Sequence, residues 1–157
     1  MFNDDGHSKE VARVLELALA RSEEMGTDQI IQVFDEAEAA CLELVSAEEF
    51  RLEVKRRVAE WKMKLHCFRD SAFGTVESLR KDVIGLGYMN LETEANLEIF
   101  FAQYCERRGR LKEARQVLQQ FRTKLESTTI EEAPGVCRFF NRYAEEILSR
   151  IDAQEPQ

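Results

Sequence analysis

The sequence predicts an all-α protein built from antiparallel helical hairpins, and three observations lead to this prediction. Apolar residues recur at steps of three and four along most of the chain, which places them on one face of a helix. The composition also favours helix, because the 157 residues include only 7 glycines and 2 prolines. The segments between the periodic stretches carry helix-capping residues rather than strand turns. We therefore expect about seven helices, the last of which caps a short stack of hairpins.

The first two expected helices form one hairpin, at about residues 9–25 and 27–45. The first follows Ser8, a good N-cap residue, and ends at Gly26, which suits the left-handed backbone found after many helices. Thr27 then caps the second helix. Because the turn between them is short, the two helices must run antiparallel.

The third and fourth helices are expected at about residues 47–68 and 76–86. Ser46 and Glu49 have the spacing of a capping box, in which each side chain bonds the backbone N–H of the other. The strongest apolar periodicity of the chain follows this box. Gly85 and Gly87 break the fourth helix.

The last three helices are expected at about residues 91–108, 111–126 and 135–151. The fifth is apolar around more of its circumference than a surface helix, so we expect it to be central. In the seventh, Phe139 and Phe140 are neighbours, and a helix cannot point two neighbours inward equally. One of these two aromatic rings is therefore expected at the surface or at a subunit contact.

Composition and charge limit the possible functions. We expect one helical domain over residues 1–157, with residues 1–7 and 152–157 disordered. The formal net charge of −8 repels phosphates and anionic lipids, which argues against nucleic-acid and membrane partners. The sequence contains neither a stretch of roughly 20 apolar residues nor a secretory signal pattern, so we expect a cytoplasmic protein.

The sequence carries no recognisable catalytic, metal or cofactor motif. The four cysteines lie far apart, and we expect them to be buried and reduced. His66 and Cys67 are adjacent, and adjacent residues on a helix do not face each other, so they are poor candidates for a base and its nucleophile. No glycine-rich phosphate loop follows a predicted strand. We therefore expect no enzymatic activity, no metal and no cofactor.

Two basic segments have alternative interpretations. Residues 55–57 (Lys-Arg-Arg) alternate with acidic residues, as on an ordinary solvated helix face. Residues 107–115 contain four arginines and one lysine around a predicted turn. This second cluster either offsets the dipole at the end of the fifth helix or binds an acidic partner.

Residues 104–121 (YCERRGRLKEARQVLQQF) place Gly109 two residues before the bulky Leu111 and five before the small Ala114. This spacing resembles the middle of a tetratricopeptide repeat, in which glycine turns the chain and alanine lets the paired helices approach closely. The resemblance covers one unit, residues 95–128. In that unit Glu98 and Glu126 replace the aromatic residue and the closing proline of the family.

The resemblance implies a short array of stacked hairpins with a groove walled by the first helix of each pair. The corresponding partner-binding residues in the fifth helix are Asn96, Ile99, Phe100, Gln103, Glu106 and Arg107. Family members that grip the C-terminal carboxylate of chaperones use Lys and Asn where this chain has Glu16 and Ala20, so that activity is not expected here.

The sequence thus favours a non-enzymatic adaptor or chaperone-like scaffold that binds a peptide or helix of a protein partner. Two alternatives stay open. One is a helical bundle that binds a small molecule in its core, with the fifth helix lining the pocket. The other is a structural homo-oligomer joined through the C-terminal helix.

Overall fold

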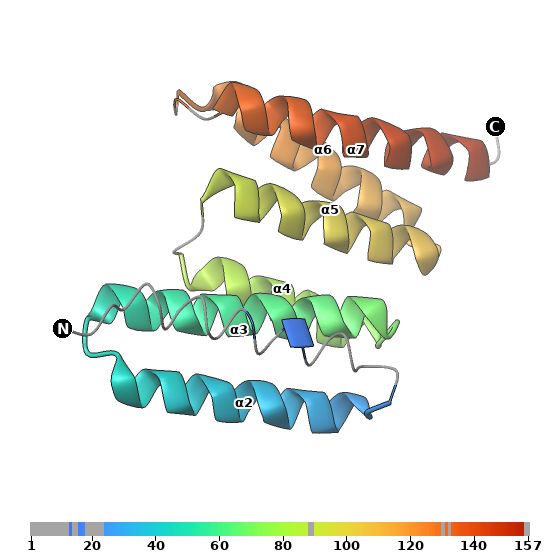
Figure 1. Cartoon of the computed structure of the whole chain (residues 1–157). Coiled ribbons are helices and arrows are strands. Elements are labelled where there is room, and N and C mark those ends of the chain that lie inside the picture. The colour runs from blue at the N-terminus through green and yellow to red at the C-terminus, as the bar shows by residue number, and fades with distance from the viewer. Residues whose placement is uncertain are drawn as a thin grey trace. The chain divides into compact units, whose positions relative to one another are not determined.

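The structure, a computed structural model, describes residues 13, 16–17, 24–87, 90–129, 131 and 133–155. Every regular element within these residues is a helix, which confirms the all-α prediction (Figure 1). The six helices are α2 (Thr27–Leu44), α3 (Glu48–Phe68), α4 (Phe73–Gly85), α5 (Leu91–Arg107), α6 (Leu111–Ser127) and α7 (Ala133–Gln154). Most of the helix expected at residues 9–25 lies outside the described residues. The count of seven and the stacking of hairpins remain predictions.

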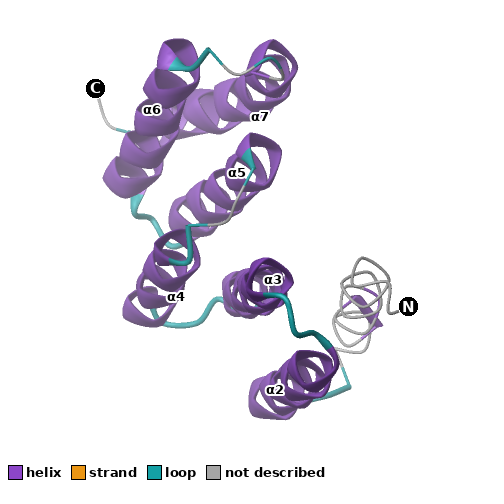
Figure 2. Ribbon diagram, turned by 90° about the vertical axis from the view of Figure 1, so that its left-hand side faces the viewer, coloured by secondary structure: helices purple, strands orange, loops and turns teal. Residues whose placement is uncertain are grey.

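The chain divides into two compact units, Met1–Tyr88 and Met89–Gln157, whereas the sequence analysis treated it as one domain. Unit 1 contains α2, α3 and α4, and unit 2 contains α5, α6 and α7 (Figure 2). No helix in the described parts of the two units is long and apolar enough to cross a membrane. Each unit has its own set of helix contacts.

In unit 1, α3 contacts both α2 and α4. Val54, Val58 and Leu65 lie on one face of α3 and pack with Ile30 and Phe34 of α2 in a hydrophobic core. None of these five residues is more than 1% exposed. The i, i+4 and i+7 spacing that predicted both helices is therefore also the spacing that brings them together.

The helix α2 contains five acidic residues and no basic one, so α3 supplies the cations that hold it. Arg51 Nη1 donates to the carbonyls of Leu42 at 2.6 Å and Val45 at 3.0 Å. These carbonyls lie at the C-terminal end of α2, where backbone acceptors lack helical donors and the helix dipole is negative. Lys62 forms an ion pair with Asp35 near the middle of the helix.

A second face of α3 carries a buried ion network. Arg56 and Glu60 are each 7% exposed, and Arg56 Nη1 lies 2.9 Å from Glu60 Oε2. Lys64 Nζ lies 2.8 Å from the other oxygen of the same carboxylate. The sequence analysis placed Arg56 on a solvated face, which is wrong: the guanidinium is buried because a carboxylate one turn away neutralises it.

In unit 2, α5, α6 and α7 each contact the other two (Figure 1). The helix α5 is buried on several faces, as its apolar circumference predicts. It ends at Gly109, whose φ of 74° lies in the left-handed region. There Gly109 N donates to Glu106 O at 3.0 Å and Arg110 N to Cys105 O at 2.8 Å, the hydrogen-bond pattern of a Schellman motif.

Several helix boundaries and caps differ from the sequence predictions. Gly26 is extended rather than left-handed, with φ −68° and ψ 155°, and Gly26 rather than Thr27 is the N-cap of α2. The N-cap of α3 is Ala47 and makes no side-chain capping bond, so the Ser46 capping box is wrong. The helix α4 begins at Phe73, about three residues earlier than expected. The helix α7 continues to Gln154, through part of the tail expected to be disordered. Its last turn is held by Arg115 of α6, whose Nη2 lies 2.7 Å from Asp152 Oδ1 and 2.9 Å from Glu155 Oε2.

Ala114 tests the close packing of α6. It is 0% exposed, so Ala114→Leu should force extra methylene groups into a filled core and destabilise the protein by about 1–3 kcal/mol. Gln120→Leu is the matched control, because Gln120 is an exposed residue of the same helix and its replacement should stay within about 0.5 kcal/mol. Urea unfolding measures both. An Ala114→Leu variant as stable as the control would contradict close packing at this position.

The buried network on α3 gives an asymmetric prediction. Glu60→Leu leaves the buried Arg56 guanidinium without a counter-ion and should destabilise the protein by about 3–5 kcal/mol. Arg56→Met should cost less, because Glu60 keeps Lys64 as a partner. The two free energies of unfolding are compared by urea titration. Equal losses would show that Glu60 is not the carboxylate shared by both cations.

Candidate functional site

Four of the six residues expected to bind a partner lie along one side of α5. Asn96, Phe100 and Gln103 are partly exposed, and Arg107 is exposed. Their spacing of four, three and four residues keeps them on a single helical stripe. Asn96 Nδ2 donates to the carbonyl of Glu92 at 3.1 Å, which holds its side chain along the helix surface.

The other two expected residues hold the fold together. Ile99 is only 6% exposed and belongs to the core. Glu106 accepts hydrogen bonds from Arg150 Nε of α7, with N–O distances of 3.0 and 2.9 Å to its two carboxylate oxygens. The resemblance to a repeat groove assigned both residues to a partner, whereas Ile99 is buried in the core and Glu106 is paired with α7.

The helix α7 contributes aromatic residues that the sequence analysis left unassigned between core and surface. Phe140 is 0% exposed and its ring centroid lies 4.7 Å from that of Phe121. Phe139 is partly exposed and packs edge-on against Tyr143, with ring centroids 5.1 Å apart. The expectation that one of the two adjacent phenylalanines leaves the core is confirmed, and that residue is Phe139.

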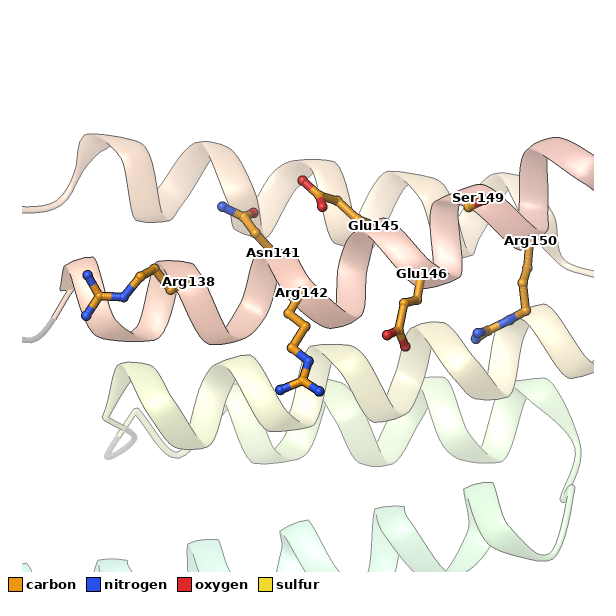
Figure 3. A pocket seen from close by; sticks show the side chains of 7 residues that line it. All are labelled: Arg138, Asn141, Arg142, Glu145, Glu146, Ser149 and Arg150. Atoms are coloured by element: carbon orange, nitrogen blue, oxygen red, sulfur yellow. The ribbon is translucent and has the colours of Figure 1, made fainter.

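Helical spacing places these aromatic residues on the edge of α7 that faces α5. The Arg150–Glu106 ion pair marks the edge of α7 that lies along α5. Phe139, Tyr143 and Glu146 lie on the same edge, because they precede Arg150 by eleven, seven and four residues. In Figure 3, the side chains of Arg142, Glu146 and Arg150 extend toward α5.

We call this surface the α5–α7 face. It comprises Asn96, Phe100 and Gln103 of α5 and Phe139, Arg142, Tyr143 and Glu146 of α7. A shallow, open hollow of about 920 Å³ adjoins it along α7 (Figure 3). The hollow is lined by Arg138, Asn141, Arg142, Glu145, Glu146, Ser149 and Arg150.

The two arginines on the edge of α7, Arg142 and Arg150, differ in whether a carboxylate neutralises them. The pKa of Arg150 is raised, mainly because its guanidinium is hydrogen-bonded to Glu106, and the negative charge of Glu146 adds to the effect. Arg142 instead has its guanidinium carbon 6.0 Å from the centre of the Tyr143 ring and forms no ion pair with any described residue. Arg142 is therefore a cation of this edge that is not bound to a carboxylate of the described residues.

Three arginines of the basic cluster around Gly109 make contacts within unit 2. Arg108 lies over the Tyr104 ring, with its guanidinium carbon 5.8 Å from the ring centroid. Arg110 pairs with Glu113 at 3.0 Å, and Arg115 pairs with the last turn of α7. These contacts favour the structural interpretation of the cluster over the alternative that it binds an acidic partner.

A serine–histidine pair lies where α3 ends. His66 Nδ1 is 2.8 Å from Ser71 Oγ, a distance that would suit a base and its nucleophile. However, the N–H groups of residues 69, 70 and 71 already bond the carbonyls of Leu65, Cys67 and His66, respectively, so none of these three can stabilise an oxyanion. The pair closes the C-terminal turn of α3, in which Asp70 adopts a left-handed φ of 49°.

The thiols and acidic residues form no reactive cluster in the described part of the chain. Cys67 and Cys105 are buried, whereas Cys41 and Cys137 are partly exposed, and none of the four forms a disulfide bond. No group of three or more His, Cys, Asp or Glu side chains that could hold a metal ion occurs among the described residues. No protein-family model, curated protein or solved structure matches the chain.

His66 gives a prediction about pH. Burial lowers its pKa below the ordinary value of 6.5, an effect that the charge of Asp28 partly offsets. The unfolded chain therefore binds a proton at a higher pH than the folded chain, and His66 should destabilise the fold as pH falls below 6.5. His66→Gln removes this effect. In urea titrations, the stability of the native protein relative to His66→Gln should fall between about pH 7.5 and about pH 5.5. A rise would contradict the direction of the shift.

Proposed function

We propose that this protein is a non-enzymatic interaction module whose α5–α7 face binds a peptide or helix of a protein partner. The observation that carries the proposal is the partly exposed pair Phe139 and Tyr143, stacked beside Arg142 at the edge of a buried core. Aromatic residues and arginine supply most of the binding energy at protein interfaces. The neighbouring Phe140 is fully buried and fills the core, so Phe139 does not contribute to the centre of the core.

The stripe on α5 complements these aromatic residues. Asn96 and Gln103 each offer amide groups that donate and accept hydrogen bonds, the groups that recognise a peptide backbone. Phe100 lies between them on the same stripe and adds apolar surface. A partner segment that lies along this face would therefore meet apolar surface and amide groups together.

A tetratricopeptide-like arrangement of unit 2 is part of this proposal. The left-handed Gly109, the buried Ala114 and the contacts of α7 with both α5 and α6 support it. The alternatives have less support. The described outer side of α7 exposes mainly charged residues, so an oligomer formed through it would bury little apolar area. The hollow along α7 is too open to enclose a small molecule.

Site-specific photo-crosslinking in the source cells tests the proposal. A benzophenone side chain introduced at Gln103 should form crosslinks to one protein reproducibly, because this position lies on the α5–α7 face. The matched control is the same side chain at Gln119, an exposed glutamine of α6. Crosslinked products are identified by mass spectrometry.

Two further variants define which residues act. Phe139→Ser and Tyr143→Ser, each combined with the Gln103 crosslinker, should reduce the yield of the crosslinked partner at least about tenfold, as expected for interface hot spots. Circular dichroism verifies that the helices persist. Equal crosslinking from Gln103 and Gln119, or a yield unaffected by the two aromatic substitutions, would show that the α5–α7 face is not the binding surface.

A further inference from the structure

We propose that the α5–α7 face selects peptide segments in which a carboxylate side chain lies next to an apolar side chain. This inference rests on the proposed function and specifies the chemistry of the partner. The carboxylate would pair with Arg142, and the apolar side chain would pack on Phe139 and Tyr143.

The preference for a carboxylate follows from the difference between Arg150, which forms an ion pair, and Arg142. Arg150 lies between two carboxylates, Glu106 through a direct ion pair and Glu146 through its nearby charge. Arg142 forms no ion pair with a described residue, although it extends toward the same helix (Figure 3). An acidic group of the partner therefore finds a cation that has no competing anion bound to it.

The surroundings of Arg142 strengthen this selection. Its guanidinium lies near the Tyr143 ring, and a guanidinium is weakly hydrated and presents a planar fork that matches the two oxygens of a carboxylate. Charge-assisted hydrogen bonds of this kind are stronger than neutral ones. The ring of Phe139 stacks on the same tyrosine, so a side chain next to the bound carboxylate meets apolar surface.

A basic side chain is a poorer match for the same position. Arg142 would repel a lysine or arginine of the partner, and the nearby Arg150 partly offsets the negative charge of the exposed Glu146. The face therefore discriminates between charges as well as between apolar and polar residues.

Selection from a phage-displayed library of random peptides tests the inference on the full-length chain. The native protein should enrich peptides that contain Asp or Glu beside a large apolar residue. Arg142→Glu reverses the local charge, so it should enrich Lys or Arg at that position instead. Peptides selected on the native protein should bind Arg142→Glu at least about tenfold more weakly in fluorescence anisotropy, as expected for the loss of a charge-assisted contact.

Lys112→Glu is the matched control. Lys112 is an exposed basic residue of α6 and lies outside the α5–α7 face and the hollow beside it, so the selected peptides should be unchanged. Enrichment without acidic residues, or the same acidic preference on Arg142→Glu, would overturn this inference and leave the binding function intact. A shift caused by Lys112→Glu as large as that caused by Arg142→Glu would also overturn it. No enriched peptide on the native protein would instead overturn the proposed function.

Discussion

The turn at Gly109 is the constraint on which unit 2 depends. Because this residue adopts a left-handed backbone, α5 reverses into α6 within three residues and the two helices lie against each other. The residues that flank the turn then fix the third helix: Glu106 holds Arg150, and Arg115 holds Asp152 and Glu155. One end of α7 is therefore attached on both sides of a single tight turn, and the rest of α7 lies along the hairpin from there.

This attachment divides the polar residues of α5 between structure and binding. Glu106 pairs with α7 and Ile99 is buried, so neither is available to a partner. Asn96, Phe100 and Gln103 remain on the adjoining stripe, and α7 adds Phe139 and Tyr143 along its facing edge. The surface proposed for binding is thus shared by two helices that are 40 residues or so apart in the chain, rather than formed by α5 alone.

The sequence predicted what depends on local spacing and missed what depends on distant neighbours. The periodic apolar residues located all six described helices to within a few residues, and Gly109 marked its turn. The end of α7 could not be predicted, because Arg115 lies 37 residues before Asp152. The burial of Arg56 and the binding of Glu106 by α7 likewise depend on tertiary packing, which a helical pattern does not encode. The two aromatic residues of α7 were recognisable as unusual, but their position beside α5 was not.

The basic side chains that stabilise α2 belong to α3, and this determines how unit 1 opens. The last turn of this helix has no basic residue of its own, and Arg51 of α3 provides the charge and the donors for its final carbonyls. Most of the stability of a helix in a protein comes from tertiary packing, and this also applies to α2. If α2 separates from α3, it loses its core contacts and its C-terminal cap in one event. Opening of unit 1 at this contact therefore converts α2 to coil instead of releasing an intact helix. The backbone amides along α2 should then exchange their hydrogens through the same opening equilibrium that breaks the α2–α3 contact.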